Sequence, residues 1–401
     1  PYAINKNKDI TRQRPINPKC NVPWYVLRSV TGRVVNFWMN NAVLKTRNWH
    51  LTRTSDVNLF WSKEKKRISI YGKNTRFIIR PYDIKNFFPN VEHDEAMKAI
   101  KYVKKKLPIS LTRFYLVKKS GRRGVRNIKQ GGNTNKQYVT ITAEEVIEYI
   151  QWAYNNQYYK LGEEIRKQTM GLPMGDPLAP PGANAIAIKE MEEFALRNPD
   201  IYNRLCILRY VDDLLAIGAY NIKQPESLTK INQIMDNIME DAKTNKEAIF
   251  CKPLLLKPEP LNEDGSTDFL EIEASLKNNG QDVRIRFKGK NETNIRNNDQ
   301  NLKYKKIVPT NTFTTNAQKN AKIVGMLFRI YANSPAIDDD THQDLRCSIY
   351  FACNEMEIQG NYTTKQLNKG IQTLYHRTQD QRLKHYSYHL TYRPRSNATS
   401  T

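Results

Sequence analysis

The sequence has few cysteines and no long apolar run. Its five cysteines are scattered along 401 residues, odd in number and free of any Cys-x-x-Cys pair, which argues against a disulfide framework or a zinc ribbon. No stretch of about 18 apolar residues occurs, so we expect no membrane span. The first residues lack the apolar core of a signal peptide. We therefore expect an intracellular, reducing compartment, either nuclear or cytoplasmic.

Acidic residues are missing from one long stretch. The chain holds 64 Lys and Arg against 40 Asp and Glu, a net charge of +24. Residues 1–143 hold 31 basic and 7 acidic residues, whereas residues 144–401 hold 33 of each. Range 96–143 contains 13 basic residues and no acid. A solvated surface would explain such a run, but its length and interleaved aromatics favour a face that contacts nucleic-acid phosphates. The predicted primer or template contacts there are Lys104, Lys105, Lys106, Arg122 and Arg123.

The remaining composition is that of a folded chain. Hydrophobic residues make up 39% of it, enough to build a core. Apolar spacing predicts helices at 93–106, 142–159, 183–197, 226–243, 317–333, 343–358 and 363–375. Thr142 and Glu145 form a capping-box pattern at the start of one of them. Short apolar runs predict strands at 75–83, 205–211, 214–218, 268–276 and 282–288. We therefore expect an α+β fold with a small antiparallel sheet flanked by helices.

Two adjacent aspartates interrupt the most apolar segment of the chain. Asp212 and Asp213 lie between the apolar runs 205–211 and 214–218. This order predicts a β-hairpin with both carboxylates at its tip. Adjacent carboxylates repel each other unless a cation lies between them, and all-oxygen ligation suits Mg²⁺ or Mn²⁺. The alternative is an exposed acidic turn without a ligand.

A third aspartate, Asp83, ends another predicted strand. On its own it would more often be a helix cap than a ligand. Together with Asp212 and Asp213 it would complete a three-carboxylate site for two metal ions about 3.5–4 Å apart, with the Ile84 carbonyl as an additional ligand. Such a site activates a primer 3′-hydroxyl and supports the departing pyrophosphate.

Glycine and proline concentrate in residues 171–180, just before a predicted helix. Glycine permits close backbone approach, and a helix N-terminus favours phosphate or a polarised base pair. An ordinary loop would show the same composition. The candidate nucleotide contacts in this loop are Gly171, Pro173, Met174 and Gly175.

These three segments together resemble the polymerase motifs of reverse transcriptases. Residues 83–88 are similar to motif A, residues 171–180 to motif B and residues 210–213 to motif C, in the same order. The resemblance implies a right-handed polymerase with palm, fingers and thumb, an antiparallel palm sheet and a helical thumb. Asp176 and Ala179 stand where the family usually has serines, a departure that bears on the template contacts of this loop.

Within this superfamily the chain resembles the polymerases of Penelope-like retroelements, which are relatives of telomerase. The similar segments are 87–96, 154–159, 191–194 and 269–272. The resemblance implies fingers over 1–76, palm over 77–100, a basic fingers segment over 101–167, palm with the primer grip over 168–288, a connector over 289–311, a helical thumb over 312–378 and a tail over 379–401.

The resemblance also implies roles for single residues. Phe88 matches the position beside the sugar 2′ carbon, where its ring would clash with a ribose hydroxyl and favour deoxynucleotides. Arg14 would clamp the incoming triphosphate through its planar guanidinium. Lys257 is a candidate nucleotide contact and general acid for pyrophosphate, with Lys252 as the alternative. The predicted contacts to the primer are Tyr210, Phe269 and Leu270.

The sequence thus predicts an RNA-directed DNA polymerase that extends a DNA primer with dNTPs on an RNA template, using two Mg²⁺ or Mn²⁺ ions. Two other functions stay open. An RNA-dependent RNA polymerase would incorporate rNTPs, which the bulk of Phe88 opposes. A retired reverse transcriptase would bind nucleic acid as a scaffold, although such proteins often lose a carboxylate and this chain keeps all three.

Overall fold

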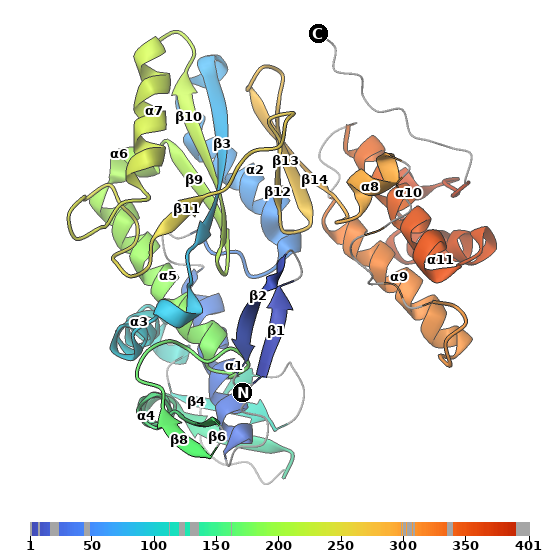
Figure 1. The fold of residues 1–401 in the computed structure, drawn as a ribbon. Helices are drawn as coiled ribbons and strands as arrows, with labels where there is room; N and C mark the ends of the chain where they lie inside the picture. Colours follow the sequence, from blue (N-terminus) through green and yellow to red (C-terminus); the bar gives the residue numbers. More distant parts are fainter. Residues whose placement is uncertain are drawn as a thin grey trace. The chain divides into compact units, whose positions relative to one another are not determined.

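Two structural units are each assembled from separate stretches of the chain (Figure 1). The first comprises Pro1–Thr52, Tyr82–Gly218 and Gln224–Glu259, and the second comprises Arg53–Pro81, Ala219–Lys223 and Pro260–Thr401. A computed structural model describes residues 2–6, 9–16, 24–43, 49–111, 113–119, 125–128, 136–161, 163–297, 299, 302, 307, 309–334 and 340–389. This division does not test the seven predicted subdomains, which stay a prediction.

The main sheet has four strands in the order β11–β3–β10–β9. Their bounds are Leu256–Pro258 for β11, Thr75–Ile84 for β3, Asp213–Asn221 for β10 and Leu205–Tyr210 for β9. β9 pairs antiparallel with β10, and β11 pairs antiparallel with β3. α7 (Pro225–Asn237) packs against this sheet: Ile231 and Met235 lie against Gly218, and the Tyr82 hydroxyl donates to the Met235 carbonyl at 2.8 Å.

Apart from its part of this sheet, the first unit contains a helical layer around α5 (Ala179–Arg197). Its other elements are β1 (Tyr2–Lys6), β2 (Asp9–Ile16), α1 (Tyr25–Val43), η3 (Phe88–Asn90), α3 (His93–Lys105), η4 (Ile109–Leu111), β4 (Phe114–Lys118), β5 (Val125–Ile128), β6 (Tyr138–Thr142), α4 (Ala143–Asn155), β7 (Tyr158–Leu161), β8 (Glu164–Lys167) and α6 (Pro199–Tyr202). α1 and α3 pack against α5. The side chains of α5 are mostly small and apolar, and most of them are buried, so the helix is covered on nearly all sides. In the predicted capping box, Glu145 N–H donates to Thr142 Oγ1 at 3.1 Å.

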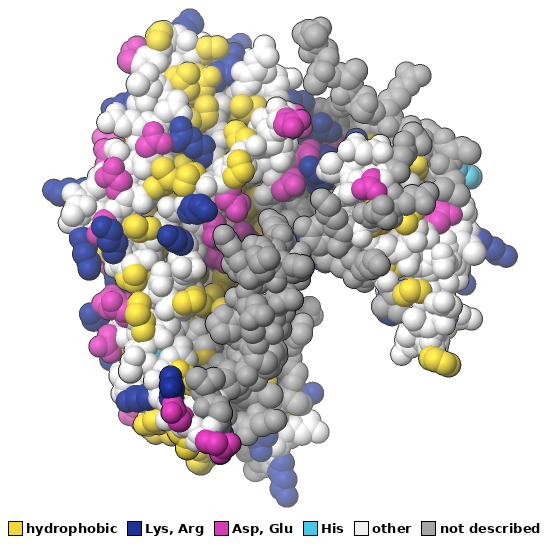
Figure 2. Space-filling model, in the orientation of Figure 1, with side chains coloured by type: hydrophobic (Ala, Val, Ile, Leu, Met, Phe, Trp, Pro, Cys, Tyr) yellow, Lys and Arg dark blue, Asp and Glu magenta, His cyan; other side chains and the backbone are white. Residues whose placement is uncertain are grey.

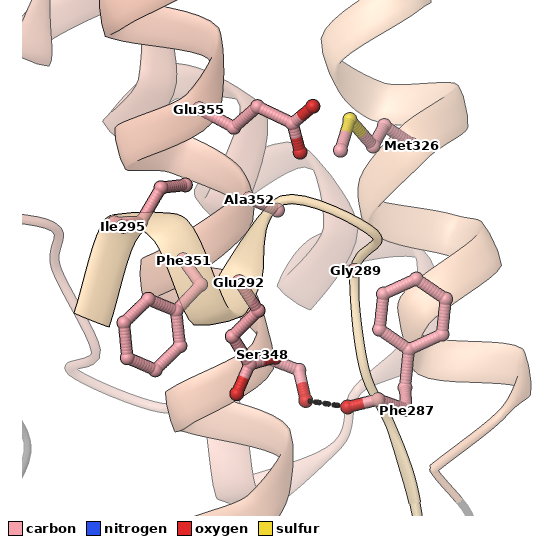
Figure 3. A pocket seen from close by; sticks show the side chains of 9 residues that line it. All are labelled: Phe287, Gly289, Glu292, Ile295, Met326, Ser348, Phe351, Ala352 and Glu355. Carbon is pink, nitrogen blue, oxygen red and sulfur yellow. Dashed lines mark hydrogen bonds between the residues drawn. The ribbon is translucent and has the colours of Figure 1, made fainter. Parts of the chain in front are cut away.

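The second unit combines a three-stranded antiparallel sheet with a helical bundle. Its elements are η1 (Thr54–Asp56), α2 (Val57–Ile68), η2 (Gly72–Asn74), β12 (Thr267–Phe269), β13 (Ile272–Lys277), β14 (Asp282–Phe287), α8 (Glu292–Arg296), α9 (Asn316–Ala332), α10 (Asp340–Gly360), α11 (Thr364–Thr378) and η5 (Gln381–Leu383). Leu327, Ile349 and Leu374 are fully buried where α9, α10 and α11 pack together. Ser348 Oγ donates to the Phe287 carbonyl at 2.8 Å, which joins α10 to the end of β14 (Figure 3).

Most of the secondary structure follows the sequence-based expectations, apart from shifted ends, one divided strand and several elements that were not expected. Every predicted helix is present, and the largest shift is at 226–243, where α7 ends at Asn237. The single strand predicted over 268–276 is wrong: a turn at Leu270 and Glu271 divides it into β12 and β13. α1, α2 and the sheet β5–β4–β6 were not predicted. Among the described residues, no helix has the length and apolar character that a membrane crossing requires.

Candidate active site

The strand end that carries Asp83 lies against the turn that carries Asp212. Asp83 is the second-last residue of β3, and the N–H of Ile84 donates to the carbonyl of Asp212 at 3.0 Å. Asp212 belongs to a two-residue turn, because Tyr210 and Asp213 are opposite each other in the β9–β10 pair. All three aspartates are half-buried. The predicted acidic hairpin therefore exists, and its tip adjoins the third acidic position.

The turn between β9 and β10 holds its first residue in a strained conformation. Val211 has φ of 59°, in the left-handed region that β-branched residues avoid. Strain of this kind costs about 1–3 kcal/mol and persists only where the surroundings hold it. The backbone that presents Asp212 and Asp213 is therefore fixed by its neighbours.

Arg209 supplies much of that support, and sequence reasoning missed it. Its side chain is fully buried. Nη1 donates to the Val211 carbonyl at 2.8 Å and to Asn184 Oδ1 at 2.9 Å, and Nη2 lies 2.7 Å from His50 Nδ1. Burial lowers the pKa of Arg209 to about 9, an effect that the nearby Asp212 opposes. The guanidinium therefore stays charged at neutral pH. A buried arginine next to a hairpin tip has no signature that distinguishes it from a surface arginine in the sequence.

Lys257 is placed beside the first aspartate by strand pairing. It is opposite Asp83 in the β11–β3 register, and residues opposite each other in an antiparallel pair project from the same face of the sheet. Lys85 N–H donates to the Leu255 carbonyl at 3.0 Å, which extends this pairing by one step. Lys252 lies elsewhere, with Nζ 3.9 Å from Asp241. Of the two candidate lysines, the fold brings Lys257 to the acidic site.

The glycine-rich loop is hydrogen-bonded to the turn that follows β3. Leu172 N–H donates to the Phe88 carbonyl and Gly171 N–H to the Val91 carbonyl, both at 2.8 Å. Gly171 has φ of 83°, and a Cβ there would come within 2.8 Å of the Pro89 carbonyl oxygen, so this position requires glycine. The segments that resemble motifs A and B are thus in direct contact.

The two phenylalanines after Asp83 have different environments. Phe87 is buried in the core, whereas Phe88 is half-buried, and their ring centroids are 5.8 Å apart. In the neighbouring loop Pro173 is buried, Met174 is half-buried and Gly175 is exposed. Of the predicted nucleotide contacts in these two segments, Phe88, Met174 and Gly175 can be reached from solvent.

Asp176, which stands where the resembling family usually has serine, has a structural partner. It forms a buried ion pair with Arg28 of α1, and its Oδ1 accepts from the Leu178 N–H at 2.9 Å. Gly32 of α1 packs against Pro177, where a Cβ would lie 2.4 Å from the carbonyl oxygen. The departure at Asp176 therefore fixes the loop to α1, a role that the sequence did not reveal because 148 residues separate the two charges.

The basic residues predicted to contact template have mixed positions. Lys104 pairs with Glu144 at 2.8 Å, and Lys106 pairs with Glu192 at 3.0 Å, whereas Lys105 is exposed. Hydrogen bonding to Glu192 raises the pKa of Lys106. On the face shown in Figure 2, basic and acidic side chains are interspersed. Two of these three lysines therefore have carboxylate partners within the fold. Arg122 and Arg123 lie outside the described residues.

The remaining predicted contacts belong to separate elements. Tyr210 is half-buried at the end of β9. Arg14 belongs to β2, opposite Ile4 of β1, and its side chain lies outside the described part of the chain. Phe269 and Leu270 are in the second unit, where Phe269 is buried and Leu270 has φ of 63° in the β12–β13 turn.

The acidic site has the donor chemistry that a divalent metal needs. Its carboxylates and backbone carbonyls are hard oxygen ligands, which suit Mg²⁺. The Ile84–Asp212 hydrogen bond brings the two acidic segments together. In the part of the chain that the structure describes, however, no three or more His, Cys, Asp or Glu side chains are gathered closely enough to hold a metal ion. The residues thus have the ligand atoms that a metal ion needs, and their backbones lie close together. Their side chains are not gathered into a coordination shell.

No protein-family profile matches the sequence, and no curated protein sequence matches it. Solved structures do match. Telomerase from Candida albicans, in complex with a TWJ fragment of telomeric RNA, is 12% identical with a TM-score of 0.55, over 87% of this chain and 52% of that chain. Apo telomerase from Candida tropicalis is 13% identical with a TM-score of 0.47, over 86% of this chain and 52% of that chain. Sicinivirus 3Dpol, an RNA-dependent RNA polymerase, is 12% identical with a TM-score of 0.31, over 81% and 54%.

Of these three structures, the Candida albicans telomerase has a TM-score above 0.5, so its likeness bears on the fold. It confirms the predicted class, an α+β polymerase fold of palm, fingers and thumb. The chain spans about half the length of the telomerase chains that it matches. At this identity the likeness concerns the fold alone, and the narrower similarity to Penelope-like polymerases stays a prediction.

Proposed function

We propose that the chain is an RNA-directed DNA polymerase that extends a DNA primer with dNTPs. One observation carries the proposal: three segments that resemble polymerase motifs A, B and C are joined by short backbone hydrogen bonds. Ile84 N–H donates to Asp212, and Leu172 N–H donates to Phe88, at 3.0 and 2.8 Å. The segment at 83–88 thus contacts two segments that lie more than 80 residues further along the chain, which supports a shared catalytic centre.

Each part of this site has a task in the proposed reaction. Asp83, Asp212 and Asp213 would hold two Mg²⁺ or Mn²⁺ ions, with the Ile84 carbonyl as a further ligand. The ions would activate the primer 3′-hydroxyl and neutralise charge on the leaving pyrophosphate. Lys257, on the same sheet face as Asp83, would donate a proton to that pyrophosphate.

Phe88 would select between deoxyribonucleotides and ribonucleotides. Its side chain is half-buried, and its backbone borders the loop that begins at Gly171, because the Phe88 carbonyl accepts from the next residue, Leu172. A ring beside the 2′ carbon excludes a hydroxyl by contact, so dNTPs would be preferred. An RNA polymerase would need room or an acceptor for that hydroxyl.

Primer extension on RNA and DNA templates tests the proposal. We expect dNTP incorporation that depends on Mg²⁺ or Mn²⁺, disappears in Asp212→Asn and persists in the control Lys230→Gln, an exposed residue of α7. Phe88→Ala should raise the use of rNTPs. Synthesis that survives in Asp212→Asn would refute the assigned site. Efficient rNTP use by the unmodified chain would indicate an RNA polymerase, and tight binding without any addition would indicate a scaffold.

We also propose that the chain belongs to the Penelope-like branch of reverse transcriptases. The support is the similarity of residues 87–96, 154–159, 191–194 and 269–272 to those polymerases. A phylogeny built on the aligned motifs, with telomerases and viral RNA polymerases included, tests the placement. Grouping with the viral enzymes would overturn it.

A further inference from the structure

We propose that Arg209 is a positioning residue that holds the Val211–Asp212 turn and places a permanent positive charge beside the two adjacent aspartates. The proposal rests on the polymerase function proposed above. It goes beyond that function because it gives the acidic turn a cation from the chain itself, present before any metal binds.

The first argument is geometric. Val211 is β-branched and has φ of 59°, so the turn needs an external restraint. Arg209 Nη1 donates to the Val211 carbonyl at 2.8 Å, which fixes the peptide plane that leads into Asp212. The same Nη1 donates to Asn184 Oδ1 at 2.9 Å, so a side chain of α5 also holds the guanidinium in place.

The backbone of Arg209 is fixed as well. Its N–H donates to the Trp49 carbonyl at 3.0 Å, and its carbonyl accepts from Leu51 N–H at 2.8 Å. These bonds flank the isolated bridge between His50 and Arg209. The arginine therefore cannot turn away from the acidic hairpin without breaking contacts on both sides.

The second argument concerns charge. Within the described part of the chain, the hydrogen-bond acceptors of Arg209 are neutral: an amide oxygen, a peptide carbonyl and a histidine ring nitrogen. Because arginine only donates, His50 Nδ1 must accept, which requires the neutral tautomer with its proton on Nε2. Burial, together with Arg209, lowers the pKa of His50 well below 6.5, in agreement with a neutral ring.

A buried charge normally has a carboxylate partner, because desolvation is costly without one. Arg209 is fully buried, and it donates to the carbonyl of Val211, the residue that directly precedes Asp212. Asp212 also lies next to a second aspartate that repels it. The positive charge of the guanidinium therefore offsets the repulsion between the two half-buried carboxylates, and the carboxylates compensate the charge of the guanidinium.

A double-mutant cycle in metal-free protein tests this coupling. Thermal unfolding in EDTA would be measured for Arg209→Met, Asp212→Asn and the double variant. We expect Arg209→Met to lower Tm, and to lower it by less than half as much when Asp212 is already neutral. An arginine that only fills space would give the same loss in both backgrounds, and that result would overturn the proposal. Arg209→Gln, which is also uncharged, takes the place of Arg209→Met in the cycle if the latter fails to fold.

Kinetics on the folded variants supply the second readout. We expect kcat for primer extension to fall about 100-fold in Arg209→Met, with the KM for dNTP little changed, because misplaced aspartates weaken the stabilisation of the transition state more than the binding of dNTP. Arg209→Lys should recover part of the loss. Arg382→Met removes another buried arginine that donates to a carbonyl, at 2.7 Å from Ser334, and should lower Tm without lowering kcat. An unchanged kcat in folded Arg209→Met would also overturn the proposal.

The two readouts separate this proposal from the proposed function. If the unmodified chain adds no nucleotide under any condition, the polymerase assignment fails, and the metal-free cycle still reports whether Arg209 and Asp212 are coupled. If extension is normal and the cycle shows no coupling, the inference about Arg209 fails alone.

Discussion

In the second unit the buried guanidinium of Arg286 lies between Glu273 and Glu292, at 2.7 and 2.8 Å, whereas in the first unit Arg209 donates to neutral groups. The carboxylates raise the pKa of Arg286 despite its burial, and burial lowers the pKa of Arg209. The Arg286 charge is neutralised within its own hydrogen bonds. The Arg209 charge acts on a turn that carries two acids. The comparison suggests that buried arginines serve stability in one unit and the site in the other.

The largest expected effect is in the second unit. Arg286→Met would remove one of the ion-pair partners of Glu292. Glu292 is 1% exposed and lines a small pocket (Figure 3). Breaking such a buried pair costs about 3–5 kcal/mol, measurable by urea unfolding. The matched control is Arg296→Met, which removes a more exposed partner of the same carboxylate and should cost less than about 1 kcal/mol. Equal losses would contradict the comparison.

Asp176→Ser should have the next largest effect, in the first unit. It restores the residue that the resembling family usually has, but it leaves Arg28 buried without its carboxylate. We expect a loss of about 3 kcal/mol in unfolding free energy. The double variant Arg28→Met with Asp176→Ser should recover more than half of that loss, since no charge then stays unpaired. A double variant no more stable than the single one would show that the ion pair is not the cause.

Glycine at the strained turn positions should increase stability in both units. Val211→Gly and Leu270→Gly replace side chains held at φ of 59° and 63°. Each should gain about 1 kcal/mol, because glycine adopts this conformation without steric cost. Val139→Gly, in ordinary strand β6, is the control and should lose stability. Thermal unfolding decides the sign, and destabilisation by both turn variants would mean that side-chain packing outweighs backbone strain.

The pH dependence of stability should report the neutral histidine beside Arg209. The folded-state pKa of His50 is lowered well below 6.5 by burial and by Arg209. Below about pH 6.5 the unfolded chain therefore binds a proton that the folded chain excludes, so stability falls as the pH decreases through this range. Above that pH the contribution of His50 vanishes. His50→Gln should flatten this slope in urea unfolding between pH 7 and 5, and an unchanged slope would show that other groups cause it.

The smallest effect concerns the salt dependence of template binding. Lys105 is exposed, whereas Lys106 pairs with Glu192 at 3.0 Å. If Lys105 contacts phosphate, Lys105→Gln should reduce the slope of log K against log salt by about 1. Lys106→Gln should leave the slope unchanged, because that ammonium already has a partner. Fluorescence anisotropy with labelled RNA measures both, and the opposite order of effects would contradict the assignment.

The carboxylates and three of the four strands of the main sheet were predictable, because their patterns are local, whereas β11 was not predicted. Asp212 and Asp213 lie between two apolar runs, and the capping box at Thr142 marked the start of α4 within one residue. Leu270 was missed as a turn residue because leucine does not usually take positive φ. Periodicity therefore predicts where elements lie, and it fails where strain or tertiary contacts override residue preference.

The supporting residues of the site could not be predicted, because their partners are distant in sequence. Asn184 and His50 approach Arg209 from 25 and 159 residues away, and each residue alone has many ordinary roles. α1 was missed for a different reason: Arg28 and Thr31 are buried polar residues that interrupt its apolar pattern. Such contacts become visible only once the chain is folded.

The interleaved composition of the two units also bears on how the protein is made. The second unit begins with Arg53–Pro81, yet Phe77 N–H bonds to the Gly280 carbonyl and Asn58 Nδ2 to the Asn333 carbonyl. At about 5–20 residues per second, a ribosome adds Gly280 roughly 10–40 s after Phe77. During that interval the Trp61–Phe77 pair of the nascent chain lacks the turn between β13 and β14 to which the Phe77 backbone bonds. We therefore expect the yield of folded protein to depend on the speed of translation and on chaperone binding to the nascent chain during this interval.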